Sequence, residues 1–105
     1  MLGTTHDDDP ARELRRVVER LGALGPDRVT RPGPDGATPA DLVRAELEVL
    51  ASEAADLRGD DHRAVPALRP HALGDQLVVL VGEALDAGAD PAAVGRRLAR
   101  LRRAL

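Results

Sequence analysis

The side chains best suited to chemistry in this chain are its three histidines and its single serine. His71 and Asp75 are four residues apart, which places them on one face of a helical turn, where they would share a hydrogen bond or hold a metal ion. Two ligands do not make a metal site, and no helical His-x-x-x-His or Glu-x-x-His pattern occurs. We therefore interpret His71 as a partly exposed histidine near the start of a helix.

The other candidates are weaker. His6 stands beside Asp7–Asp9 and His62 beside Asp60 and Asp61, which predicts a tail and a loop, respectively. Ser52 lies in the middle of a predicted helix, whereas a nucleophilic serine of the hydrolase type stands on a sharp exposed turn. The sequence therefore predicts no catalytic residue, no metal site and no cofactor.

Seven residue types are missing from the chain: Phe, Trp, Tyr, Cys, Lys, Ile and Asn. Without Lys there is no P-loop and no Schiff-base chemistry, and without Cys there is no thiolate zinc site or disulfide framework. Several of the missing types have AT-rich codons, which indicates a GC-rich bacterial source. We expect a protein that is not an enzyme.

Arginines cluster near the C-terminus, where residues 89–105 carry five arginines and one aspartate. Residues 38–61 carry seven acids and two arginines. An acidic and a basic helix of this kind form complementary faces of one bundle. Alternatively, the arginines bind acidic groups on a protein partner. A third interpretation lays the arginines along nucleic-acid phosphates, but the net charge of −3 and the lack of aromatic residues argue against it. The candidate interaction surface is Arg96, Arg97, Arg100 and Arg103.

Capping signals predict the first two helices. Asp9 and Pro10 open a helix over residues 10–24, and Gly25-Pro26 ends it before a loop at 25–37. Thr38 then caps a second helix in a capping-box variant with Asp41. Its apolar residues form one heptad seam, which consists of Val43, Leu47, Leu50, Ala54 and Leu57.

A third helix is predicted from near His71 to Ala87, with Gly74 and Gly82 inside it. Its apolar residues occupy almost every side, which predicts the most buried helix of the fold. Residues 77–81 also fit a buried strand, but no second strand is predicted to pair with it. The two glycines are explained either by a close approach of another helix or by GC-rich coding. Asp90-Pro91 opens a fourth helix, and the short connection predicts an antiparallel hairpin with the third.

The prediction is a compact all-α domain of four helices over residues 10–105, preceded by a flexible acidic tail at 1–9. We expect a cytoplasmic, non-enzymatic module that binds a protein partner, with self-association through the seam of the second helix as one form of that interaction. The alternative is a nucleic-acid-associated regulator that uses the C-terminal helix. An enzyme built on His71 and Asp75 is a weaker third option. The longest apolar run, residues 77–81, is far shorter than the roughly 20 residues of a membrane span, so no membrane interaction is expected.

Overall fold

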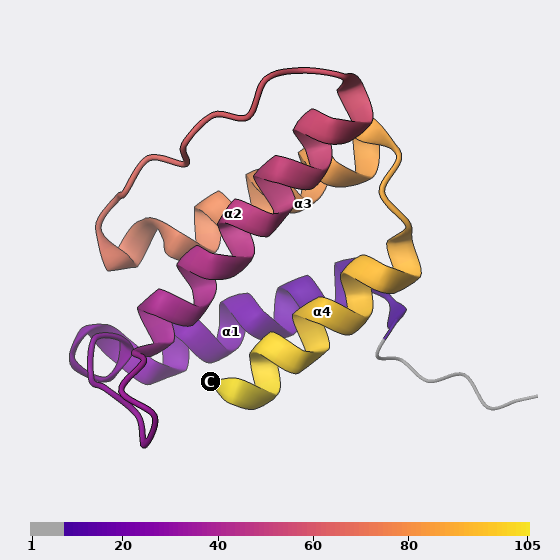
Figure 1. The fold of residues 1–105 in the computed structure, drawn as a ribbon. Coiled ribbons are helices and arrows are strands. Elements are labelled where there is room, and N and C mark those ends of the chain that lie inside the picture. The colour runs from indigo at the N-terminus through magenta and orange to yellow at the C-terminus, as the bar shows by residue number, and fades with distance from the viewer. Residues whose placement is uncertain (1–7) are drawn as a thin grey trace, which may run out of the picture.

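The structure is a computed structural model, and it describes residues 8–105. Four helices follow one another along the chain (Figure 1), with a short 3₁₀ turn before the third: α1 (Pro10–Val29), α2 (Pro39–Arg58), the turn (Pro70–Ala72), α3 (Leu73–Ala87) and α4 (Pro91–Ala104). Residues 8–105 contain no strand, and residues 77–81 are helical. The predicted all-α, four-helix domain is confirmed.

The helix starts follow the predicted cap-then-proline pattern. Asp9 Oδ1 accepts a hydrogen bond from the backbone N–H of Arg12 at 3.3 Å. The capping box of α2 is complete, because Thr38 Oγ1 accepts from the N–H of Asp41 at 3.0 Å and Asp41 Oδ2 accepts from the N–H of Thr38 at 3.1 Å. Asp90 precedes Pro91 as predicted, but its side chain makes no capping hydrogen bond.

The first helix is longer than predicted. Gly25 leaves the helical conformation at φ 76° and ψ 171°, so the predicted break is present. Pro26 then restarts one more turn, because its fixed φ suits the first position of a helix. Val29 at the end of that turn is buried in the core. Burial of Val29 thus extends the helical segment beyond the break.

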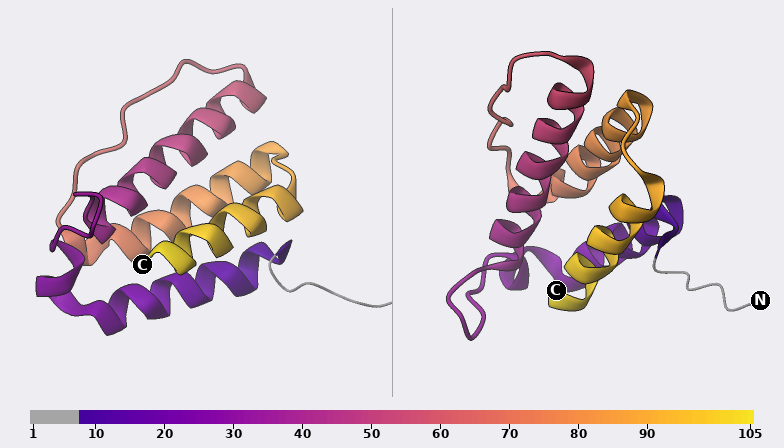
Figure 2. Two further views of the ribbon diagram at one scale, coloured as in Figure 1. Left: turned by 60° about the horizontal axis from the view of Figure 1, so that its bottom comes forward. Right: turned by 45° about the vertical axis from the view of Figure 1, so that its right-hand side comes forward.

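Two helix pairs pack most closely, α1 with α4 and α2 with α3. Figure 2 shows the pairs stacked on each other, with α3 and α4 running in opposite directions. The predicted antiparallel direction is therefore present, although each of these two helices packs closely on a different neighbour. The aliphatic core between the pairs draws on all four helices and includes Val17, Leu47, Leu77, Val94 and Leu98.

The expectation that α3 is the most buried helix is wrong. Four of its 15 residues are buried, against five of 14 in α4. Val78 and Val79 are 50% and 56% exposed, because they lie on the sides of α3 that α1 and α2 do not cover.

The glycines inside α3 and α4 differ in whether a larger side chain would fit at their positions. A Cβ at Gly82 would meet nothing within 4 Å, and one at Gly74 would make an ordinary contact of 3.6 Å with Val18 Cγ1. Neither position therefore needs glycine for packing within the chain. Gly95 of α4 does, because a Cβ there would lie 2.5 Å from the backbone carbonyl carbon of Asp8. The predicted tail at 1–9 falls mostly outside the described residues, but Asp8 crosses α4 at Gly95 and Asp9 caps α1.

None of the helices within residues 8–105 combines the length and the apolar character that crossing a bilayer requires.

Candidate functional site

Arg97 on α4 joins the two halves of the fold. Its Nε donates to Glu46 Oε2 at 3.1 Å and its Nη2 donates to Glu53 Oε1 at 3.0 Å. The two glutamates are seven residues apart on α2 and share one face of that helix. The predicted complementarity between an acidic second helix and a basic fourth helix is therefore confirmed at this contact.

The pKa values of this cluster reflect its partial burial. Burial raises the pKa of Glu46 above its ordinary value, although the nearby charge and hydrogen bond of Arg97 lower it. Burial alone would lower the pKa of Arg97, but its hydrogen bonds and charge interactions with Glu53 and Glu46 outweigh burial and raise it. Arg97 thus stays charged and bound to α2.

The four arginines predicted as one surface therefore do not lie on the same face of α4. Arg97 is 20% exposed and bound to α2, whereas Arg96, Arg100 and Arg103 are exposed along α4. The helical spacing explains why Arg97 differs from the other three. Arg97 lies about 100° around the helix axis from Arg96, whereas Arg100 and Arg103 both lie within about 40° of Arg96. A solvent-facing surface on α4 would consist of Arg96, Arg100 and Arg103 only.

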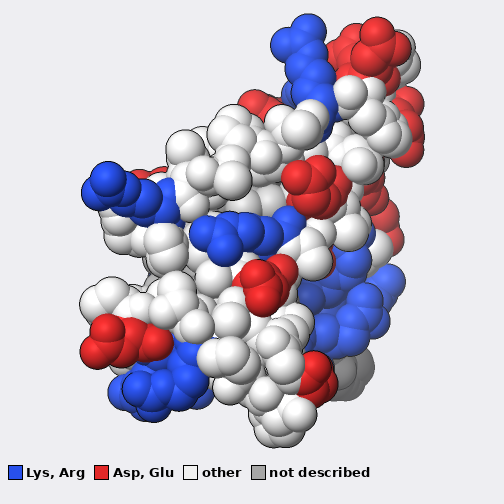
Figure 3. Space-filling view, turned by 60° about the vertical axis from the view of Figure 1, so that its left-hand side comes forward, with Lys and Arg blue, Asp and Glu red and all other residues white. Residues whose placement is uncertain are grey.

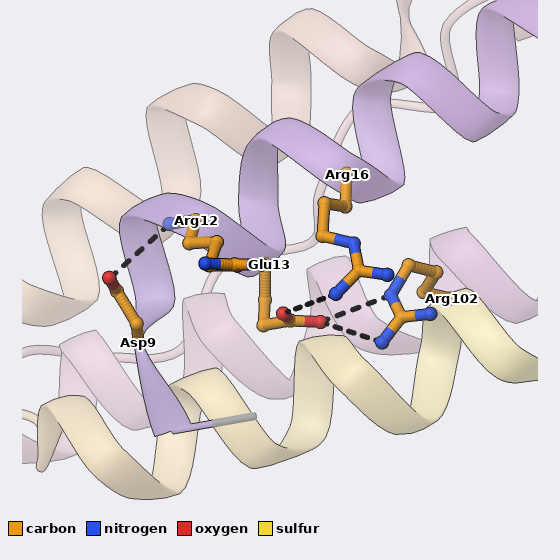
Figure 4. Close-up of polar contacts among 5 residues, drawn as sticks. All are labelled: Asp9, Arg12, Glu13, Arg16 and Arg102. Atoms are coloured by element: carbon orange, nitrogen blue, oxygen red, sulfur yellow. Dashed lines mark hydrogen bonds and ion pairs between the residues drawn. The ribbon is translucent and has the colours of Figure 1, made fainter. Parts of the chain in front are cut away.

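A second ion pair lies between α1 and α4. Glu13 is completely buried, and its Oε1 lies 3.0 Å from Nε and from Nη2 of Arg102. Arg16 Nη1 lies 3.5 Å from the other oxygen, and Figure 4 shows both guanidinium groups directed at the carboxylate. This cluster is internal to the fold and was not predicted from the sequence.

A shallow groove runs between the C-terminal half of α2 and the connection from α3 to α4. We call it the α2–α4 groove. Val49 and Leu57, at its sides, are 46% and 49% exposed. Its lining also contains four acids and Arg97: Glu48, Glu53, Asp56 and Asp90. An apolar strip with an acidic border is the surface that a basic amphipathic segment would cover.

The seam predicted on α2 does not form a surface of this kind. Val43, Leu47, Leu50 and Ala54 are buried against the core, and Leu57 alone is half-exposed. The fold itself therefore covers this seam except at Leu57, and it leaves little of the seam for contact with a second copy. Val49, next to Leu50 in the sequence, faces the α2–α4 groove.

The segment from Asp60 to Arg69, which we call the strap, runs back along α2 to the start of α3 (Figure 1). Side chains of α2 hold it at three points: Asp56 pairs with His62, Glu48 Oε1 accepts from the N–H of Val65 at 3.3 Å, and Arg44 Nη2 donates to the carbonyl of Leu68 at 3.2 Å. Gln76 of α3 adds a fourth contact by donating to the carbonyl of Pro66 at 2.9 Å.

A second hollow, the strap pocket, lies between the strap, α2 and α3 and has a volume of about 900 Å³. Its α2 wall is made of small side chains, Ala51, Ala54 and Ala55, and Val79 and Leu80 of α3 contribute aliphatic surface. Charged residues of both signs also line the pocket, and acids outnumber arginines: Asp60, Asp61, Asp75, Glu83, Arg58 and Arg63.

Charge separates between the two helix pairs. The helices α1 and α4 carry ten arginines and three acids, whereas α2 and α3 carry eight acids and two arginines. Figure 3 shows acids and arginines interspersed on one face, with a group of acids at the upper right of the view beside a basic side chain. The α2–α4 groove and the strap pocket both border α2, which belongs to the acidic pair, and four acids line each of them.

Among residues 8–105, the two histidines and the serine form no reactive cluster. His71 and Asp75 are both exposed, and His62 pairs with Asp56 rather than with its sequence neighbours. Ser52 lines the α2–α4 groove without a histidine in that lining. Within residues 8–105, no three His, Cys, Asp or Glu side chains are placed to hold a metal ion. His6 and Asp7 lie outside the described residues.

Comparison with protein-family models, with curated proteins and with solved structures finds no match to this chain.

Proposed function

We propose that this protein is a small, non-enzymatic interaction module, an adaptor or accessory subunit, that binds a basic amphipathic helix of a protein partner in the α2–α4 groove. The observation that supports it is the placement of two half-exposed aliphatic side chains, Val49 and Leu57, within a border of four acids. Apolar anchors give affinity when they are desolvated, and surrounding charges give orientation and a faster association. A cytoplasmic location is part of this proposal.

The lack of cysteine allows a direct test. Ser52→Cys places a single thiol in the groove, where a photo-reactive cross-linker can be attached before incubation with nuclease-treated extract of the native cells. Ala45→Cys supplies the matched control, because Ala45 is exposed on α2 but does not line the groove. We expect one defined polypeptide to cross-link from position 52 and not from position 45.

Two valine variants then show whether the groove itself is bound. Val49→Ser in the Ser52→Cys background removes a groove anchor, whereas Val78→Ser removes an equally exposed valine from α3. We expect the first variant to abolish the cross-link and the second to preserve it. A cross-link that survives Val49→Ser, or that forms equally from position 45, would overturn the proposal.

The second candidate function is a nucleic-acid-associated regulator, and the excess of arginine on α1 and α4 favours it. Arg96 and Arg100 are exposed, so Arg96→Glu with Arg100→Glu tests it without breaking the ion pairs of Arg97. A regulator would lose binding to duplex DNA in this variant and would bind more weakly as salt rises. If the wild-type protein binds the cross-linked partner but is not retained on DNA, the regulator is excluded and the interaction module is supported.

A further inference from the structure

We propose that the strap pocket is a second binding site, separate from the α2–α4 groove, and that it takes a small aliphatic molecule with a cationic amine group. A volume of about 900 Å³ lies within the range of roughly 300–1,000 Å³ typical of small-molecule sites. Its residues and those of the groove do not overlap, because the two hollows lie on opposite sides of α2.

The shape of the pocket depends on small residues. Ala51, Ala54 and Ala55 form the α2 side, and any longer side chain at these positions would occupy part of the hollow. The opposite wall presents Val79, which is 56% exposed. Because the whole chain lacks aromatic residues, the pocket offers no stacking surface, and an aliphatic body fits it better than a planar ring.

The polar part of the lining favours a cation. Four acids and two arginines border the pocket, and one of the arginines, Arg58, already donates from Nη2 to the carbonyl of Glu83 at 3.3 Å. A hollow bordered by an excess of negative charge concentrates cations and repels anions of the same shape. An ammonium group near Asp75 and Glu83 would be stabilised there.

The strap favours a small molecule over a folded partner. It is joined covalently to α2 at one end and to the start of α3 at the other, and four side chains hold it between those ends. A partner helix would have to displace these contacts, whereas a single alkyl chain fits beneath the strap as it stands. The ligand class is therefore an aliphatic amine.

The test uses n-octylammonium as the probe and octanoate as its anionic counterpart of equal chain length. Titration of the full chain is followed by amide chemical shifts, with Ala51, Ala55 and Val79 reporting on the pocket and Val49 on the groove. We expect saturable shifts at the pocket, none at the groove, and binding of octylammonium about fivefold tighter than octanoate, as one or two exposed charge contacts allow.

Ala55→Leu fills the pocket while keeping a strong helix former, and Ala45→Leu is the same change at an exposed position outside both hollows. We expect the first variant to weaken octylammonium binding at least tenfold and the second to leave it unchanged, with both variants folded by circular dichroism. Equal binding of octanoate, retained binding in folded Ala55→Leu, or no saturable shift at the pocket would overturn the proposal.

Discussion

Glu13 of α1 and Arg102 of α4 form an ion pair in which the carboxylate is completely buried, with Oε1 3.0 Å from both Nε and Nη2 of the guanidinium. The two residues are 89 positions apart in the sequence. A buried charge is tolerated only where charged partners satisfy it, so this pair fixes how α4 lies on α1. Arg16 contacts the same carboxylate at a longer distance of 3.5 Å.

Arg102→Ala should strongly destabilise the protein, because it removes the nearer partner of a carboxylate that has no access to water. Removing one partner of a buried pair costs about 3–5 kcal/mol, and we expect a loss toward the lower end because Arg16 remains. Urea unfolding followed by circular dichroism measures the loss. Arg96→Ala on the exposed side of α4 is the control, with an expected change within about 0.5 kcal/mol.

The double variant Glu13→Leu with Arg102→Leu tests the cause of that loss. Replacing a buried pair with apolar residues is often neutral or stabilising, so the double variant should be more stable than Arg102→Ala. If both variants were equally unstable, the loss would come from packing of the arginine stem rather than from the unpaired carboxylate.

The glycines of α3 and α4 should respond in opposite ways to alanine. Gly82→Ala should stabilise the protein by up to about 1 kcal/mol, because a Cβ there meets nothing and alanine is the better helix former. Gly95→Ala should destabilise it, because the new Cβ would collide with the backbone of Asp8 and force that segment away from α4. Thermal unfolding of the two variants measures both changes.

The outcome of Gly82→Ala also bears on self-association. If alanine at position 82 lowered stability in a manner that depended on protein concentration, a second copy would approach α3 at this glycine. Unfolding at two concentrations separates the two cases, and we expect no dependence.

Asp41 should contribute to stability at neutral pH and lose that contribution in acid. Its hydrogen bonds with the backbone and side chain of Thr38 lower its pKa below the ordinary value of 3.8. A lowered pKa in the folded state gives stability that is present above the unfolded pKa and is lost as pH falls through the folded value. Asp41→Asn should reduce the loss of stability as pH falls, which thermal unfolding at a series of acid pH values measures. If the variant lost as much stability in acid as the wild type, the expectation would be contradicted.

The helix boundaries could be predicted from sequence because their signals are local. Asp9, Thr38 and Gly88 act within one turn of the residues they cap, so a short window of sequence contains the whole interaction. The single helical turn that follows Gly25 could not be predicted in this way, since it depends on burial of Val29 against distant helices.

The site could be predicted only in part. An acidic α2 facing a basic α4 was predicted, but the spacing did not show which arginine turns inward or that Val49 lies in a groove. Glu13 did leave a signal, because it is four residues before Val17 and eleven before Leu24 and so lies on the buried stripe of α1. The strap contacts join segments without periodicity, and sequence patterns contain no signal for them.

Glu46 should show the opposite pH dependence from Asp41. Burial raises its pKa above the ordinary value of 4.5, so the folded state holds its proton more tightly than the unfolded chain does. The resulting stability is fully present below the unfolded pKa and is lost as pH rises through the folded value. Glu46→Gln cannot ionise, so the stability of the wild type relative to this variant should fall over that interval. Urea unfolding at a series of pH values measures the difference, with Glu19→Gln on the exposed surface of α1 as the control. A relative stability that rises with pH would mean that the contact with Arg97 outweighs burial at this carboxylate.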